Sequence, residues 1–305
     1  MATSALGTDT AGSVRIPAAC CGIVGLKPTF GRVSKQGVFP LSWTLDHVGP
    51  MTKTVRDAAL MLQYMAGFDA KDASSVDAPF DGGELESTSL QGVTIGIPEK
   101  EAYDLVDDAV KQGMERTIRQ LEELGAVVKP VTIKSLVHVP FISLVTYGTE
   151  ASTIHHQQIL DRPEDFGPDV RKFLKFGEVI TGTQYLKAQQ LRRVITNELE
   201  EIYKTVDALI LPTIPIPAPD INQMTVKVGN EEIDVMESLL RLTQIANVTG
   251  LPSLAVPSGL SKDNLPVSIQ IVGNAFQEEK IVNIGYQLEQ TNPLAGKIPE
   301  IEIAQ

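Results

Sequence analysis

Apolar side chains recur at helical spacing in three segments of the chain. The first follows Thr54, which together with Asp57 matches a helix-capping pair. The second covers residues 104–124, and the third covers residues 184–204 with Thr183 in the capping position. Polar residues occupy the positions between, so each segment predicts a helix that buries one face against a core.

Short apolar runs bounded by glycine and proline predict buried strands. The runs are GVTIGIP (92–98), AVVKPVTI (126–133), VDALILPTIPIPAP (206–219), NVTGLPSLAVPSG (247–259) and LPVSIQIVG (265–273). Predicted helices and strands alternate along the chain. This alternation predicts an α/β fold.

Two segments near the N-terminus carry less regular patterns. Residues 18–34 are apolar and punctuated by glycine, which predicts a buried loop running into a short strand. Residues 69–91 are acidic and rich in turn formers, so we expect an exposed connection there. The 305 residues are 43% hydrophobic, which is enough to bury a sizeable core.

The charge balance excludes one class of function. A formal net charge of -12 with no lysine or arginine cluster argues against a dedicated nucleic-acid surface. No apolar run approaches the ~20 residues of a membrane span, and no signal peptide is visible. Cys20 and Cys21 are adjacent, and neighbouring cysteines seldom bridge. We therefore expect a cytoplasmic protein with no membrane partner and no direct nucleic-acid partner.

The stretch GTDTAGSVRIP (7–17) carries the candidate chemistry. Glycines and small polar residues around Ser13 let backbone N–H groups converge on one point, as an oxyanion hole beside a nucleophilic serine requires. The same residues also fit a plain glycine-rich turn in which Ser13 caps a helix. The local pattern leaves both interpretations open.

A longer run around this stretch closely resembles one known family. Residues 5–62, from ALGTDTAGSVRIPAACCG through LKPTFGRVS to TVRDAALML, are similar to the amidase-signature family of amide hydrolases. This family includes the A subunit of the glutamine-dependent aminoacyl-tRNA transamidase. The resemblance continues in residues 207–219 and 247–282. It implies a mixed central β-sheet covered by helices on both faces.

The resemblance assigns roles within the opening stretch. Ser13 matches the acyl-enzyme nucleophile, and Asp9 and Arg15 match flanking positions that support the loop through hydrogen bonds and an ion pair. The family usually has two glycines before the serine, whereas the first is Ala11 here. Its methyl group would be tolerated at negative φ but would crowd the acyl pocket. The oxyanion hole would consist of the backbone N–H groups of Thr10, Ala11, Gly12 and Ser13.

The family relay has two further members, a bridging serine and a neutral lysine. By the resemblance both would lie upstream of Met1, and residues from Met1 to Ser4 would fall inside or at the end of the helix that links those segments to the loop. Ser4 lacks the family context of the bridging serine, and Lys27 matches a structural position. We therefore expect residues 1–305 to form a single amidase-signature domain that is incomplete at its N-terminus. A serine without its base is a poor nucleophile, so we expect this chain alone to be nearly inactive.

Three functional hypotheses follow from the resemblance. The first is an amidase that cleaves a small-molecule carboxylic amide through a serine acyl-enzyme. The second is the A subunit of the glutamyl-tRNA(Gln)/aspartyl-tRNA(Asn) amidotransferase, which tends to carry an aspartate shortly before its GLP segment. Leu239–Thr243 holds no acidic residue here, which favours the amidase. The third is a non-catalytic truncated remnant.

No metal or nucleotide motif appears, so we expect no cofactor and no metal. A missing N-terminal portion would leave a sheet edge exposed, which predicts self-association or an N-terminal partner that covers it. Trp43 is expected to pack in the core. We expect packed or solvated roles for the histidines, which are His47, His138, His155 and His156.

Overall fold

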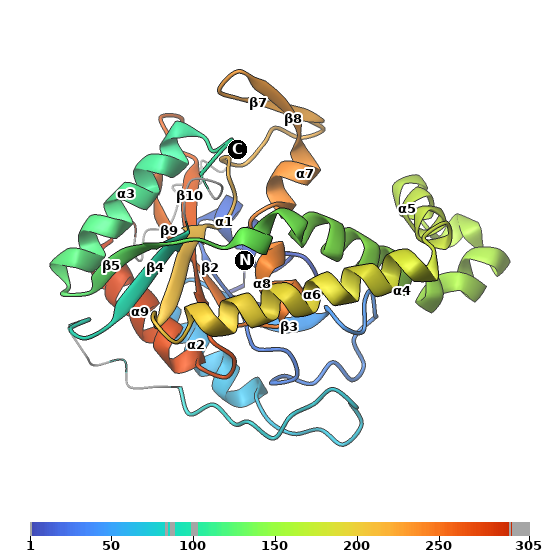
Figure 1. Cartoon of the computed structure of the whole chain (residues 1–305), viewed down its shortest axis with the longest axis horizontal. Coiled ribbons are helices and arrows are strands. Elements are labelled where there is room, and N and C mark those ends of the chain that lie inside the picture. The colour runs from blue at the N-terminus through green and yellow to red at the C-terminus, as the bar shows by residue number, and fades with distance from the viewer. Residues whose placement is uncertain (1, 83–84, 86–88, 99–102, 293, 295–305) are drawn as a thin grey trace, which may run out of the picture.

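A mixed β-sheet runs through the molecule in the computed structural model of the chain (Figure 1). The structure describes residues 2–82, 85, 89–98, 103–292 and 294. Eight strands from this described part form the sheet. In spatial order they are β1 (Ser4–Asp9), β3 (His47–Thr52), β2 (Val24–Lys27), β9 (Ser253–Leu260), β10 (Pro266–Gly273), β6 (Ala208–Pro212), β4 (Thr94–Pro98) and β5 (Val127–Val131).

The strand directions divide the sheet into two parts. The strands from β1 to β6 pair antiparallel, whereas β6, β4 and β5 run parallel to one another. The parallel connections pass through helices, as such crossovers require. In the antiparallel part, Asp9 at the end of β1 lies opposite His47 at the start of β3.

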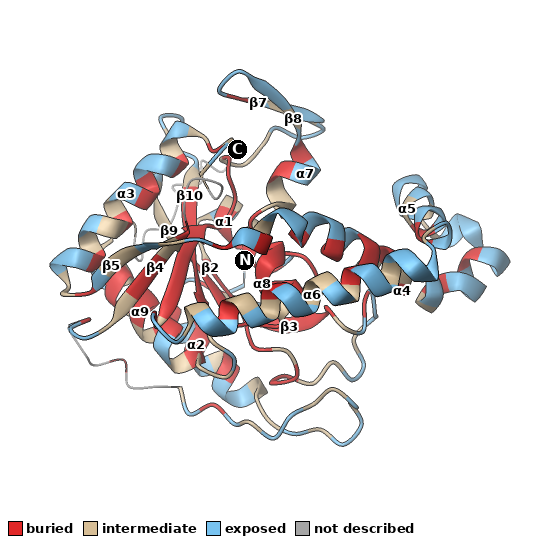
Figure 2. Ribbon diagram, viewed as in Figure 1, coloured by how far each residue is buried: buried red, intermediate tan, exposed pale blue. Residues whose placement is uncertain are grey.

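Helices cover both faces of the sheet because its central strands are apolar on both sides. Along β6, Ala208 and Ile210 face one core, and Leu209 and Leu211 face the other. Buried residues accordingly fill the sheet and the inner faces of the helices (Figure 2). The predicted α/β fold with helices on both faces is confirmed.

The first core is covered by α2 (Val55–Met65), α3 (Asp108–Glu123) and α9 (Glu278–Thr291). The second is covered by α4 (Val139–Asp161), α6 (Gly182–Ile202) and α8 (Gln244–Thr249). The remaining elements are α1 (Arg15–Cys21), α5 (Pro168–Glu178), α7 (Val235–Leu240), the 3₁₀ turns η2 (Lys134–His138) and η3 (Pro163–Asp165), and a separate hairpin of β7 (Thr225–Val228) and β8 (Glu231–Asp234). No helix in the described part of the chain is long and apolar enough to span a bilayer.

Several elements differ from the sequence expectation at their boundaries. The third predicted helix begins at Gly182, and its cap is Thr181 rather than Thr183, because Gln184 completes a capping box with Thr181. The second begins only at Asp108, where Asp107 caps it. The first helix is capped by Thr54 as predicted.

Near the N-terminus the corrections are larger. Residues 18–21, predicted as loop, belong to α1, whose core side is formed by Ala18 and Ala19. The segment that contains Ser4 is strand β1 rather than a helix. Within the predicted exposed connection at 69–91, residues 83–84 and 86–88 lie outside the described part of the chain. Its described residues are partly exposed, but Phe80 inserts into the core, where Arg32 lies over its ring at 5.8 Å.

Candidate active site

The candidate loop, residues 10–14, joins β1 to α1. Ser13 is exposed, whereas its neighbours Gly12 and Val14 are buried. Ser13 does not cap α1: the N-cap residue is Val14, whose side chain makes no capping bond. The plain turn with a capping serine is therefore wrong, because Ser13 projects from a buried loop without such a bond.

An ion pair holds the two ends of this loop together. Arg15 Nε donates to Asp9 Oδ2 at 3.0 Å, and Arg15 Nη2 donates to Asp9 Oδ1 at 3.1 Å. Both side chains are fully buried. The backbone N–H of Val14 adds a third bond to Asp9 Oδ2 at 3.2 Å. This bidentate arrangement fixes the start of α1 relative to the end of β1.

Residues far along the chain complete the environment of the pair. Asn247 Nδ2 donates to Asp9 Oδ1 at 2.8 Å, and Arg15 Nη2 donates to Asn247 Oδ1 at 2.6 Å. Arg15 Nη1 donates to Gln270 Oε1 and to the Thr243 carbonyl, each at 2.9 Å. The buried charges thus have partners from α8 and β10, as buried ions require.

The roles of Asn247, Gln270 and Thr243 were not predicted from the sequence. One signal was present for Gln270, because it is a polar residue inside the apolar run LPVSIQIVG. Its amide group also bonds to the carbonyls of Leu242, at 2.8 Å, and Pro212, at 3.2 Å. A buried polar side chain in a central strand implies a specific partner.

The charge state of Asp9 follows from these contacts. Burial by itself would raise the pKa of this carboxyl group. The charge of Arg15 and its hydrogen bond act in the opposite direction, with smaller contributions from Lys27 and Asn247. Together they hold the pKa of Asp9 well below its usual range. Asp9 is therefore ionised at neutral pH, and the ion pair is permanent under those conditions.

Gly12 occupies a conformation and a space that only glycine fits. Its φ is +137°, and a Cβ added there would lie 2.4 Å from Thr243 Oγ1. Thr243 Oγ1 in turn donates to the Ala11 carbonyl at 2.6 Å. Ala11 has no positive φ, so its methyl group is accommodated without backbone strain. Thr243 therefore packs against Gly12 and bonds to Ala11, the two residues that precede Ser13.

The backbone N–H groups of residues 10–13 remain available. Among the described residues, none accepts a hydrogen bond from them. The Thr10 hydroxyl is engaged elsewhere, since it donates to Asp46 Oδ1 at 2.6 Å. Asp46 also accepts from the N–H groups of Leu41 and Ser42, each at 2.9 Å, which fixes its position. Backbone donors in a buried loop without an acceptor can bind a developing oxyanion.

No described side chain is hydrogen-bonded to Ser13 Oγ as a base. The nearest buried lysine in the sequence, Lys27 at the end of β2, donates to the Pro28 carbonyl at 3.0 Å. Burial, reinforced by the charge of Arg15, lowers the pKa of Lys27 well below its usual value. Lys27 is thus a packed residue behind the loop in this structure.

The histidines occupy packed or surface positions. His47 is buried, and its Nδ1 lies 2.7 Å from the Leu45 carbonyl. His155 lies between the Pro40 carbonyl and Gln158 Oε1, at 2.8 and 2.9 Å. His156 pairs with Glu178 on the surface. Trp43, expected to pack in the core, is 47% exposed.

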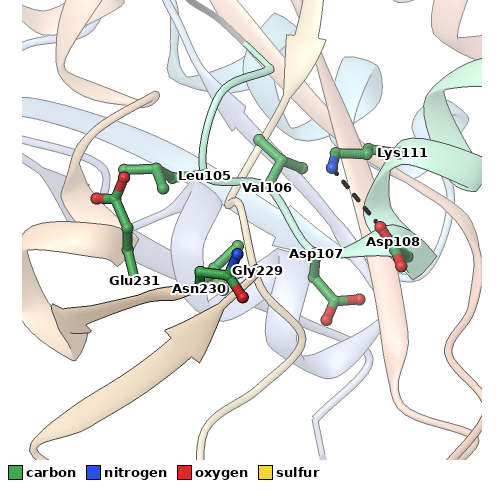
Figure 3. A pocket seen from close by; sticks show the side chains of 9 residues that line it. Leu105, Val106, Asp107, Asp108, Lys111, Gly229, Asn230 and Glu231 are labelled. Atoms are coloured by element: carbon green, nitrogen blue, oxygen red, sulfur yellow. Dashed lines mark ion pairs between the residues drawn. The ribbon is translucent and has the colours of Figure 1, made fainter.

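A polar cavity of about 360 Å³ lies between the start of α3 and the β7–β8 hairpin (Figure 3). Its charged residues compensate one another in part, since Lys111 turns toward Asp108 at 3.6 Å. Asp107 is occupied as the cap of α3. Glu231 extends toward Leu105 from the hairpin (Figure 3). None of the residues at the loop of Ser13 lines this cavity.

Comparison with known proteins decides the family. A family model described as Amidase matches residues 1–282. The chain belongs to the amidase-signature family. It is 40% identical over 301 residues to an amidase of Pseudomonas putida, covering 97% of this chain and 64% of that protein.

Other members of the amidase-signature family are similar as well. The A subunit of the glutamyl-tRNA(Gln) amidotransferase of Pseudomonas savastanoi pv. phaseolicola is 35% identical over 323 residues, covering 97% of this chain and 65% of that protein. The crystal structure of the corresponding A subunit from Thermotoga maritima superposes with a TM-score of 0.82 at 34% identity, covering 97% of this chain and 64% of that one. The chain thus spans 64–65% of the length of the two curated relatives.

Proposed function

We propose that this chain carries the nucleophile of an amidase, which hydrolyses the C–N bond of a small-molecule carboxylic amide. One observation carries the proposal: Ser13 is exposed on a buried loop whose N–H groups, at residues 10–13, have no acceptor among the described residues. Asp9 and Arg15 support that loop through their buried ion pair. Similarity to an amidase over 97% of the chain supports the same assignment.

The proposed reaction has two halves. Ser13 Oγ attacks the amide carbonyl carbon, and the N–H groups of Thr10, Ala11, Gly12 and Ser13 hold the oxyanion of the tetrahedral intermediate. The C–N bond then breaks, the amine or ammonia leaves with the serine proton, and an ester on Ser13 remains. Water hydrolyses this ester and releases the acid. No step uses a metal or cofactor.

We further propose that the 305-residue chain alone turns over slowly. The support is that no described side chain is positioned as a base at Ser13 Oγ. The oxyanion donors would still provide residual acceleration, as they do when relay members are removed from other serine hydrolases. Release of ammonia or amine from a panel of alkyl and aryl amides tests both proposals. We expect slow release that Ser13→Ala abolishes; an unchanged rate in Ser13→Ala would refute the role of Ser13, and rapid turnover would refute the slow rate.

A second candidate is the A subunit of an amidotransferase, which is favoured by similarity to two such proteins. Glutamine is the diagnostic substrate. Ammonia release from glutamine that exceeds release from simple alkyl amides would favour the amidotransferase. Absence of an acidic residue in Leu239–Thr243 argues for the general amidase. A truncated, non-catalytic remnant is the remaining alternative, and it predicts no Ser13-dependent reaction with either substrate.

We propose that the chain self-associates or binds a partner along strand β1. The strand forms one edge of the sheet, and its residues Ser4, Ala5 and Leu6 are exposed. An unprotected edge strand offers free N–H and C=O groups for pairing. Similarity to one component of an amidotransferase is consistent with an assembly. The free thiols Cys20 and Cys21 support the cytoplasm as the proposed compartment.

A further inference from the structure

A second cavity, of about 640 Å³, lies where the turn η2 and the start of α4 meet the connection between α7 and α8. Its volume lies within the range of small-molecule sites. Its walls are mostly apolar and are formed by Ile133, Leu136, Val137, Pro140 and Leu242. The cavity is therefore suited to the apolar part of a small ligand.

Charged residues stand among these apolar walls. Arg241 and Lys134 line the cavity together with a single carboxylate, Asp104. Positive side chains outnumber negative ones among the lining residues, with Glu237 near Arg241 and Glu198 near Lys134 outside the lining, although the chain as a whole carries a net charge of -12. This contrast favours an anionic group on the ligand.

Most N–H donors of the Arg241 guanidinium group have no hydrogen-bond acceptor among the described residues. Its Nη2 donates to the Leu105 carbonyl at 3.1 Å, and no described carboxylate forms an ion pair with the guanidinium group. Asp104 and Glu237 act on it only through their charge at a distance. A guanidinium group with unused N–H donors at an apolar wall matches the geometry of a ligand carboxylate, which it can bind with two parallel hydrogen bonds.

No residue of the Ser13 loop lines this cavity, but the chain connects the cavity wall to a residue that contacts the loop. Leu242 lines the cavity, and the next residue, Thr243, packs against Gly12 and bonds to the Ala11 carbonyl. Gln270 Nε2 donates to the Leu242 carbonyl at 2.8 Å, and Gln270 Oε1 accepts a hydrogen bond from Arg15 Nη1. The wall of the cavity and the support of the loop thus share the same buried network.

We propose that this cavity binds the part of the amide substrate remote from the scissile bond, and that this part is an apolar group bearing a carboxylate held by Arg241. The inference rests on the proposed amide hydrolysis at Ser13. It narrows the substrate class to amides of carboxylated apolar compounds. Neutral amides of the same size would bind more weakly, because they leave the guanidinium donors without an anion.

Binding of a matched pair of probes tests the carboxylate directly. We choose 3-phenylpropanoate and 3-phenylpropan-1-ol, which share an apolar body, and measure their affinities by NMR titration of the whole chain. The acid should bind at least tenfold more tightly than the alcohol, and Arg241→Ala should remove this preference. Arg119→Ala, an exposed arginine on α3, is the matched control and should change neither affinity. Equal affinities in the unaltered chain, or an acid preference that survives Arg241→Ala, would overturn the proposal.

Asp104→Asn removes a negative charge from the cavity wall while keeping the size of the side chain. Asp104 is exposed, so the substitution should leave the fold intact. Removing its negative charge should tighten binding of 3-phenylpropanoate about threefold and leave the alcohol unchanged. Unchanged or weaker binding of the acid would count against the assignment.

Protection of Ser13 separates this inference from the function on which it rests. Saturating 3-phenylpropanoate should slow the reaction of Ser13 with a fluorophosphonate in the unaltered chain and have no effect in Arg241→Ala. Unprotected labelling would overturn the cavity as a substrate site while leaving the nucleophile in place. Arg241-dependent binding of the acid without any labelling of Ser13 would refute the amide hydrolysis alone.

Discussion

Asp9 and Arg15 are the residues on which the geometry of the Ser13 loop depends most. Their charges are fully buried, and they bond to each other, to the side-chain amides of Asn247 and Gln270, and to the backbone of Val14 and Thr243. Removing one charge of such a pair leaves the other uncompensated, which is far more costly than the net contribution of the intact pair. Substitutions at this pair should therefore have large effects on stability.

Asp9→Asn should lower the free energy of unfolding by about 3–5 kcal/mol, because Arg15 keeps its charge without a counter-charge. Urea unfolding followed by circular dichroism measures the change. Asp263→Asn, at an exposed aspartate, is the control and should stay within about 0.5 kcal/mol of the unaltered chain. A loss at Asp9 as small as that of the control would show that the pair contributes nothing specific.

The same pair predicts a dependence on pH. The depressed pKa of Asp9 means that its stabilisation is present above the ordinary value of 3.8 and is lost as the pH falls below it. The Asp9→Asn chain lacks this titrating group. Its stability should therefore fall less steeply than that of the unaltered chain between neutral and acidic pH.

Gly12 is the residue at which backbone conformation and space act together. Gly12→Ala would place a methyl group 2.4 Å from Thr243 Oγ1 at a φ of +137°. Gly37 also has a positive φ, of +82°, but a Cβ there meets nothing within 4 Å. We expect Gly12→Ala to cost about 3 kcal/mol or more and Gly37→Ala about 1–2 kcal/mol, as measured by urea unfolding. Equal losses would mean that the contact with Thr243 is readily relieved.

The sequence predicted the site residues that lie in one short motif, but not those that come from distant segments of the chain. Asp9, Ser13 and Arg15 lie in one short motif, so their proximity follows from the chain itself. Asn247 and Gln270 are 232 and 255 residues from Arg15. Only the pairing of strands and helices brings them together, and no periodicity in the sequence specifies that contact.

At the scale of the elements, the amphipathic pattern predicted where the helices lie. It predicted the residues at which they begin less accurately. The pattern records which face is buried, whereas a helix end depends on which of several nearby polar residues bonds to the backbone. Thr181 and Thr183 both precede the apolar positions of α6, and only Thr181 accepts from Gln184 N, at 3.2 Å. The choice between them depends on a geometry that the pattern does not contain.

The position of this cap can be tested with a matched pair of substitutions. Thr181→Ala should lower the free energy of unfolding by about 1 kcal/mol, because it removes the capping hydroxyl of α6. Thr183→Ala lies inside the helix and should change it by less than about 0.5 kcal/mol. A larger loss at Thr183 in thermal or urea unfolding would identify Thr183 as the cap instead.

Strands with little burial escaped the sequence analysis altogether. β1 has three exposed residues at its start, and the β7–β8 hairpin is mostly exposed. A strand is recognised by alternation or by a continuous apolar run; β7 alternates over only four residues, TVKV, and the exposed start of β1 and β8 show neither pattern. The central strands β4, β6, β9 and β10 are apolar on both faces, and all four were predicted.

At the scale of the whole molecule, the sheet has two unequal edges. β5 forms one edge, and Pro130 within it has no backbone N–H, so the row of donors along this edge is incomplete. β1 forms the other edge, where Leu6 is 62% exposed. We expect concentration-dependent self-association through β1, detected by size-exclusion chromatography with light scattering.

Leu6→Lys should reduce that self-association, because a charge on an edge strand opposes pairing. Leu60→Lys is the matched control: Leu60 is 51% exposed but lies on helix α2 rather than on the edge strand. A monomer at all concentrations, or an equal effect of both substitutions, would contradict pairing through β1.

The central claim is that Ser13 is a nucleophile served by the donors of its own loop. The most direct measurement is reaction of the chain with a fluorophosphonate, followed by mass spectrometry of the tryptic peptide that ends at Arg15. We predict slow phosphonylation of Ser13 alone in that peptide, with none in Ser13→Ala. An unmodified peptide, or modification of Ser4 in place of Ser13, would contradict the account.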